Sequence, residues 1–135
     1  PVVRACTDGK AFRGVGGTSG PAVLVPTVAD LVIFAVTLAN YEEHSDFWKP
    51  EVAREFFAPC PDADQALGFR RYSLELGREH VTMLGHPGFV GCAVGFVPGR
   101  GIALAMASNR LVTTGVPVPT EELWRQALVI TPPIR

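Results

Sequence analysis

The chain has 135 residues, a length that fits one ordinary domain. Hydrophobic residues make up 47% of it and charged residues 19%, which is enough apolar side chain for a packed core and excludes a largely disordered chain. The formal net charge is −1 and the 12 basic residues are spread along the sequence, so the basic stripe of a nucleic-acid-binding protein is absent.

The three cysteines form no metal-binding or disulfide pattern. Cys6, Cys60 and Cys92 are odd in number and far apart, without the short Cys-x-x-Cys or Cys/His spacing of a zinc site. The apolar run over residues 31–38 is much shorter than the ~20 residues that cross a bilayer. We therefore expect no metal, no cofactor and no membrane span in this chain.

The first expected helix covers residues 28–40. The preceding residues 8–20 contain five glycines and few large apolar side chains, which is typical of a loop. Thr27, followed three residues later by Asp30, resembles an acidic capping box at the start of a helix. Apolar side chains then recur at helical spacing, namely Val28, Leu31, Phe34, Ala35 and Leu38.

A second, short helix is predicted from Pro50, because proline suits the first position of a helix. Its apolar face consists of Val52, Ala53, Phe56 and Phe57. This helix should end before Pro59, and residues 59–65 should form a surface connection.

Three runs with strand character follow. They cover residues 67–76, residues 81–84 running into 88–97, and residues 101–108. Gly77 and Arg78 supply the turn after the first run. Residues 98–101, Pro-Gly-Arg-Gly, are few enough to close an antiparallel hairpin.

The last expected element is a helix that Thr120 caps and that runs through residues 121–128, with Glu121 and Glu122 at its positive end. The order is two helices, three or four antiparallel strands and a helix. It predicts an α+β fold in which helices flank one antiparallel sheet. With three strands strongly indicated, we expect one face of the sheet to need cover from outside this chain.

Three stretches together resemble one enzyme family. The first is Gly-Gly-Thr-Ser-Gly-Pro-Ala-Val-Leu-Val-Pro-Thr at residues 16–27, followed by Ala-Asp-Leu at 29–31 and by Phe34. The second is Gly-His-Pro-Gly-Phe-Val-Gly at 85–91, and the third is Ala-Met-Ala-Ser-Asn-Arg at 105–110. In order and spacing they resemble the serine β-lactamase-like, or penicillin-binding-protein-like, family. This family includes class C β-lactamases, D-alanyl-D-alanine carboxypeptidases and related esterases.

The resemblance implies that residues 1–135 are a single partial domain, the carboxy-terminal part of a β-lactamase/transpeptidase-like fold. It also implies a serine hydrolase that cleaves an ester or amide bond, in a peptide, ester or β-lactam-like substrate, through an acyl-enzyme. That chemistry needs a serine with a lysine one helical turn later. The sequence has two lysines, Lys10 and Lys49, and three residues before them stand Thr7 and Asp46. We therefore expect the amino-terminal half of the domain to supply the nucleophile, and no turnover by this chain alone.

Within this resemblance, the substrate lies against residues 85–91. His86 would donate a hydrogen bond to a substrate carboxylate or assist proton transfer, and otherwise it is a histidine that satisfies a turn at the sheet edge. The backbone N–H of Phe89 is the implied oxyanion donor, and Gly88 permits close approach of substrate, unless the two form an ordinary bulge. Pro87 replaces the family's threonine and removes a hydroxyl and a backbone donor, which implies a groove-facing or edge-facing position and a changed or lost activity.

Other polar residues are poor candidates for the nucleophile. Thr7 and Lys10 have the right spacing but stand beside a glycine, and Ser19 fails the Gly-x-Ser-x-Gly pattern at Pro21. Tyr72 belongs to an expected strand. The second hypothesis is a non-catalytic binding or interaction module, homo-oligomers included, that keeps the half-fold and pairs with another chain through an uncovered sheet face.

Overall fold

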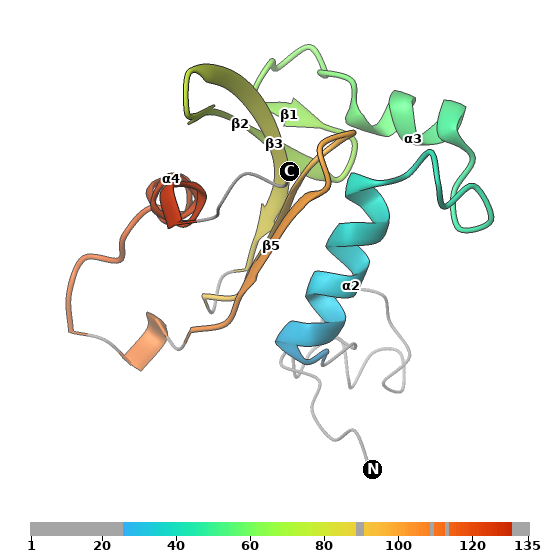
Figure 1. Cartoon of the computed structure of the whole chain (residues 1–135). Coiled ribbons are helices and arrows are strands. Elements are labelled where there is room, and N and C mark those ends of the chain that lie inside the picture. Colours follow the sequence, from blue (N-terminus) through green and yellow to red (C-terminus); the bar gives the residue numbers. More distant parts are fainter. Residues whose placement is uncertain (1–25, 89–90, 109, 113, 131–135) are drawn as a thin grey trace.

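The computed structural model describes residues 26–88, 91–108, 110–112 and 114–130. These residues form three α-helices, a short 3-10 helix, η1 (Arg110–Val112), and a five-stranded antiparallel sheet (Figure 1). The expected α+β class, with helices flanking an antiparallel sheet, is confirmed. No helix in the described ranges is long and apolar enough to span a bilayer.

Helix α2 (Val28–Ala39) begins at a capping box, as the sequence predicts. The Thr27 hydroxyl accepts a hydrogen bond from the backbone N–H of Asp30 at 3.2 Å. In return, the Asp30 carboxylate accepts one from the backbone N–H of Thr27 at 2.8 Å. These reciprocal bonds satisfy two donors that the first turn of a helix leaves free, which fixes where α2 starts.

Helix α3 (Pro50–Phe57) begins at the expected proline and buries Ala53 and Phe57. Arg71 secures the segment after α3, because its guanidinium donates to the backbone carbonyls of Phe57 at 2.7 Å and Ala63 at 3.1 Å. The chain then enters the sheet beside the end of this helix.

The sheet has the strand order β1-β2-β3-β4-β5, and every neighbouring pair is antiparallel. The strands are β1 (Gln65–Ala66), β2 (Phe69–Leu76), β3 (Glu79–Pro87), β4 (Ala93–Val97) and β5 (Ile102–Met106). The prediction of a strand over residues 88–97 was wrong at its start. There the chain reverses instead, because the Gly88 N–H bonds to the Cys92 carbonyl at 2.6 Å and Gly91 has a φ of +106°.

Each face of the sheet carries a helix, so the expectation of a face left uncovered was wrong. Helix α4 (Thr120–Ile130) lies on one side of the sheet and α2 on the other (Figure 1). Trp124 and Leu128 of α4 pack on Tyr72, Leu74 and other side chains of one face. The opposite face buries Leu84 and Phe96 against α2 and α3.

Candidate functional site

The described residues of the stretch at 85–91, namely 85–88 and 91, lie at the end of β3 and between β3 and β4. His86 and Pro87 are the final two residues of β3, and Gly88 follows the strand directly. Phe89, which the sequence assigns as the oxyanion donor, lies outside the described residues. Three of the four expected site residues can therefore be placed.

The turn after β3 is packed against the end of β5. The Gly91 N–H donates to the Gly88 carbonyl at 3.1 Å, and the Ser108 hydroxyl donates to the Gly91 carbonyl at 2.9 Å. A Cβ at Gly91 would overlap the Ser108 hydroxyl and lie 3.0 Å from Cγ of Arg110. The second and third of the stretches that carry the family resemblance thus contact each other in the fold.

The end of β3 has an open edge on the side of β2. The pairing of β2 with β3 stops at Arg70 opposite Gly85, whereas β4 continues to pair with β3 through Pro87. Because backbone N–H groups alternate in direction along a strand and that of Gly88 points to β4, the nitrogen of Pro87 points away from β4. The absence of an N–H on Pro87 therefore removes no hydrogen bond between β3 and β4. This agrees with the expected edge-facing position of this proline.

His86 is exposed on the face of the sheet that α2 and α3 cover. It pairs with Val94 on β4, and it follows Leu84, which is buried under these helices, by two residues. On the side of β2 the pairing ends at Gly85, one residue before His86, and Phe69 is the first residue of β2. The imidazole thus stands at the rim of an apolar face, at the open edge of β3.

A hollow of about 360 Å³ lies at this edge. Its lining consists of Gln65, Ala66, Gly68, Phe69, Arg70, His86 and Pro87. None of the described residues that line it is acidic, and the imidazole of His86 lies on the face that α2 and α3 cover. Arg70 pairs with Gly85, so its side chain points to the opposite face, that of Tyr72 and α4. The hollow therefore suits the polar, electron-rich end of a ligand, such as a carbonyl or a carboxylate.

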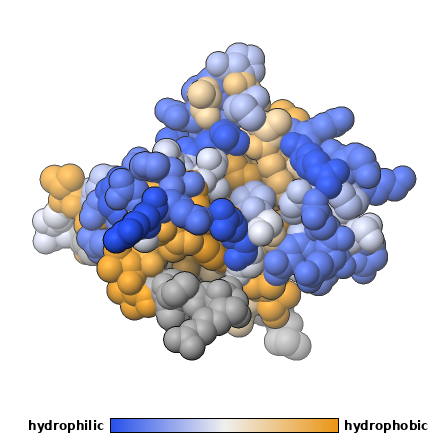
Figure 2. Space-filling view, turned by 45° about the horizontal axis from the view of Figure 1, so that its top comes forward, coloured by the Kyte–Doolittle hydropathy of each residue, from blue (hydrophilic) through white to orange (hydrophobic). Residues whose placement is uncertain are grey.

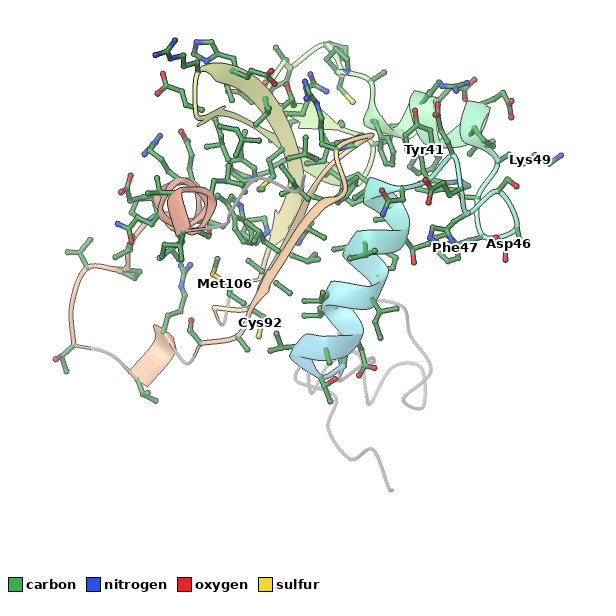
Figure 3. The ribbon with its side chains drawn as sticks, in the orientation of Figure 1. Tyr41, Asp46, Phe47, Lys49, Cys92 and Met106 are labelled. Atoms are coloured by element: carbon green, nitrogen blue, oxygen red, sulfur yellow. The ribbon has the colours of Figure 1, made fainter. Side chains whose placement is uncertain are left out.

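Gly88 lines a different hollow, of about 400 Å³, on the other side of the turn. This second hollow lies between the start of β4, the end of β5 and the start of α4, and its wall includes Cys92, Met106 and Ser108. Figure 3 shows Cys92 and Met106 close to each other at that end of the sheet. The structure therefore brings His86 and Pro87 together at one cavity and places Gly88 at another.

The residues that the sequence rejected as nucleophiles do not form a catalytic group in the described structure. Tyr72 lies in β2, as expected, and is buried under α4, where burial raises the pKa of its hydroxyl. Lys49 is an exposed N-cap residue of α3. Thr7, Lys10 and Ser19 lie outside the described residues.

Sequence reasoning missed Gln65, Phe69 and Arg70 as neighbours of His86. Arg70 is the direct cross-strand partner of Gly85, so a register drawn from the two-residue turn at Gly77 and Arg78 would have found it.

Over the part of the chain that the structure describes, no three His, Cys, Asp or Glu side chains are close enough to hold a metal ion. Comparison of the chain with models of protein families, with curated proteins and with solved structures finds no match.

Proposed function

We propose that this chain is part of a serine β-lactamase-like hydrolase and forms the sheet side of its active site, where an ester or amide is cleaved through an acyl-enzyme. The observation that carries the proposal is that the described parts of the second and third family-like stretches are in contact at one end of the sheet and that the helix of the first stretch begins at the same end. The second stretch ends β3, the third follows β5, and Ser108 joins them through the Gly91 carbonyl.

The first stretch reaches the same end through α2. The Gly99 N–H, in the turn between β4 and β5, donates to the carbonyl of Ala39, the last residue of α2, at 2.8 Å. The 12 residues of α2 span about 18 Å, close to the ~17 Å of the five-residue strands that it covers. The start of α2, at Thr27, therefore lies at the opposite end, where β3 and β5 finish (Figure 1).

The proposal gives two residues of this chain a role in catalysis. His86, at the open edge of β3, donates a hydrogen bond to the carbonyl or carboxylate of the substrate. The backbone N–H of Phe89 stabilises the oxyanion of the tetrahedral intermediate. The attacking serine and its lysine belong to a segment outside the printed sequence, since the only lysines are Lys10 and Lys49 and neither follows a serine at the required spacing.

Two arms test this function. The reading frame upstream of Pro1 is expected to encode a Ser-x-x-Lys, and the protein that includes it should show a burst with p-nitrophenyl butyrate and label with a fluorescent penicillin. The 135-residue chain alone should show neither the burst nor the labelling. A burst by the printed chain, or an upstream frame without Ser-x-x-Lys, would contradict the proposal.

The role of His86 is tested in the longer protein by His86→Gln, with His80→Gln as the matched control. Both histidines are exposed residues of β3, but His80 lies at the far end, next to the turn from β2. We expect kcat/KM for the ester to fall about 100-fold in the first variant and to remain unchanged in the second. Equal effects of the two substitutions would remove His86 from the site.

A further inference from the structure

A third hollow, which is apolar, adjoins the one that contains His86. It has a volume of about 370 Å³, and its lining consists of Phe34, Leu38, Phe47, Trp48, Phe56, Leu67, Gly68 and Phe69. The rings pack edge to face, with centroids 6.3 Å apart for Phe34 and Phe47 and 4.6 Å apart for Trp48 and Phe56. Within the described structure, no ionisable side chain lines this hollow, which we call the aromatic hollow.

The aromatic hollow is open to solvent at its rim. Phe47 lies in the segment between α2 and α3 (Figure 3). Its side chain is 56% exposed, that of Leu67 50% and that of Phe34 41%. Other apolar side chains are also exposed at the surface, beside hydrophilic ones (Figure 2). Large apolar side chains gathered around a concavity are typical of a binding site for an apolar group.

The aromatic hollow and the His86 hollow share part of their walls. Gly68 and Phe69 line both. Gly68 has a φ of +80°, and no atom comes within 4 Å of the position where its Cβ would be. At this point the two hollows are separated by the backbone of Gly68, which carries no side chain. A single ligand therefore has room to extend from the aromatic hollow into the His86 hollow.

The two hollows differ in chemistry. One is lined by aromatic and aliphatic side chains, and the other presents the polar imidazole of His86. A ligand that fills both must have an apolar, ring-bearing part and an electron-rich polar end.

We propose that the two hollows together bind one small amphipathic acyl compound, an aromatic carboxylate or its ester, with the ring in the aromatic hollow and the carboxyl group at His86. Its identification as the acyl part of the substrate rests on the proposed function, whereas its binding does not. The serine hydrolase would then prefer arylalkanoyl esters to acetyl esters.

The binding is tested on the printed chain with 4-phenylbutyrate, followed by tryptophan fluorescence and calorimetry. Trp48 lines the aromatic hollow, whereas Trp124 is 1% exposed under α4. We expect saturable quenching that the conservative variant Trp48→Phe abolishes while calorimetric binding persists. Butyrate, which lacks the ring, should bind at least about tenfold more weakly.

Matched variants separate the two hollows. Phe47→Ala and Leu67→Ala, which change exposed side chains, should each weaken binding at least about fivefold. Ile33→Ala, on the same helix as Phe34, 66% exposed and not part of the lining, should have no effect. His86→Leu should weaken binding of 4-phenylbutyrate, whereas His80→Leu, at the other end of β3, should leave it unchanged.

The outcomes decide between distinct conclusions. If Phe47→Ala and Leu67→Ala bind 4-phenylbutyrate as the unchanged chain does, or if no binding is detected, the proposed ligand site is wrong, whatever the hydrolysis tests show. If the variants weaken binding as expected but the longer protein has no esterase burst, the ligand site is supported and the proposed function is wrong.

Discussion

At the residue scale, Thr27 stabilises the first turn of α2 through both its hydroxyl and its backbone N–H. The hydrogen bonds from Thr27 lower the pKa of Asp30, the side-chain bond contributing most. A carboxyl whose pKa is lower in the folded state contributes stability above its unfolded pKa, and this contribution is lost as pH falls through the folded value. The capping box should therefore contribute most near neutral pH.

Thr27→Ala is expected to lower the free energy of unfolding by about 1 kcal/mol at pH 7. The difference from the unchanged chain should shrink as the pH falls below about 4, where Asp30 becomes protonated in the unfolded state and then in the folded state. Urea unfolding at several pH values measures it. Thr37→Ala is the control, because the Thr37 hydroxyl bonds only to the Ile33 carbonyl one turn before it in the same helix. A constant difference across this pH range would exclude the carboxylate from the cap.

Residues whose role depends on their near neighbours in sequence could be predicted, and residues defined by strand pairing could not. The Thr27 cap and the start of α3 at Pro50 follow from contacts within one helical turn, so the sequence pattern was sufficient. The position of Arg70 beside Gly85 depends on the register of two strands joined by a turn. The lining of the His86 hollow was missed for that reason.

At the element scale, the turn between β3 and β4 is the feature of the sheet that could not be predicted from the apolar pattern of the sequence. Val94, Phe96 and their neighbours continue the apolar character of β3, so the two strands resemble one interrupted run. Backbone conformation separates them, because Gly91 at a φ of +106° lies in a region that other residues rarely adopt. Pro87, at the end of β3, also limits further pairing of that strand.

Gly91→Ala should destabilise this turn by more than about 1 kcal/mol, because the added Cβ meets both an unfavourable φ and the side chains of Ser108 and Arg110. Urea unfolding measures the loss. Gly99→Ala, in the turn between β4 and β5, also has a positive φ, of +71°, but its Cβ would contact no atom within 4 Å. The first variant should therefore be less stable than the second. Equal losses of stability in the two variants would show that the positive φ alone determines the loss and that the overlap with Ser108 adds nothing to it.

At the scale of the whole molecule, the sheet is the middle layer between two helical layers. Alternation along β3 sends Met83 to the face of α4 and Leu84 to that of α2 and α3. The sequence predicted the three helices and the runs that contain β2 to β5, but it missed the short β1, whose Gln65 was expected in a surface connection. It also did not show how the helices are divided between the faces, because each amphipathic helix could pack on either side. The arrangement also removes the uncovered sheet face on which the alternative of an interaction module depended.

The docking of α4 on its face of the sheet can be measured with two adjacent residues. Leu128 is 3% exposed and packs in the cluster that contains Trp124, whereas Val129 is 83% exposed. Leu128→Ala should lower the free energy of unfolding by about 2 to 5 kcal/mol, since it leaves a cavity between α4 and the sheet. Val129→Ala should change it by less than about 0.5 kcal/mol.

The fluorescence of Trp124 tests whether that cavity loosens the packing of α4 on the sheet. In a Trp48→Phe background it is the single tryptophan of the chain, and its emission should shift to longer wavelength in Leu128→Ala under native conditions, because water gains access to the loosened helix. In Val129→Ala the emission should stay unchanged. If both variants unfold at the same urea concentration with the same emission, α4 does not pack on the sheet through Leu128. That face would then be available for a partner, as the sequence alone had suggested.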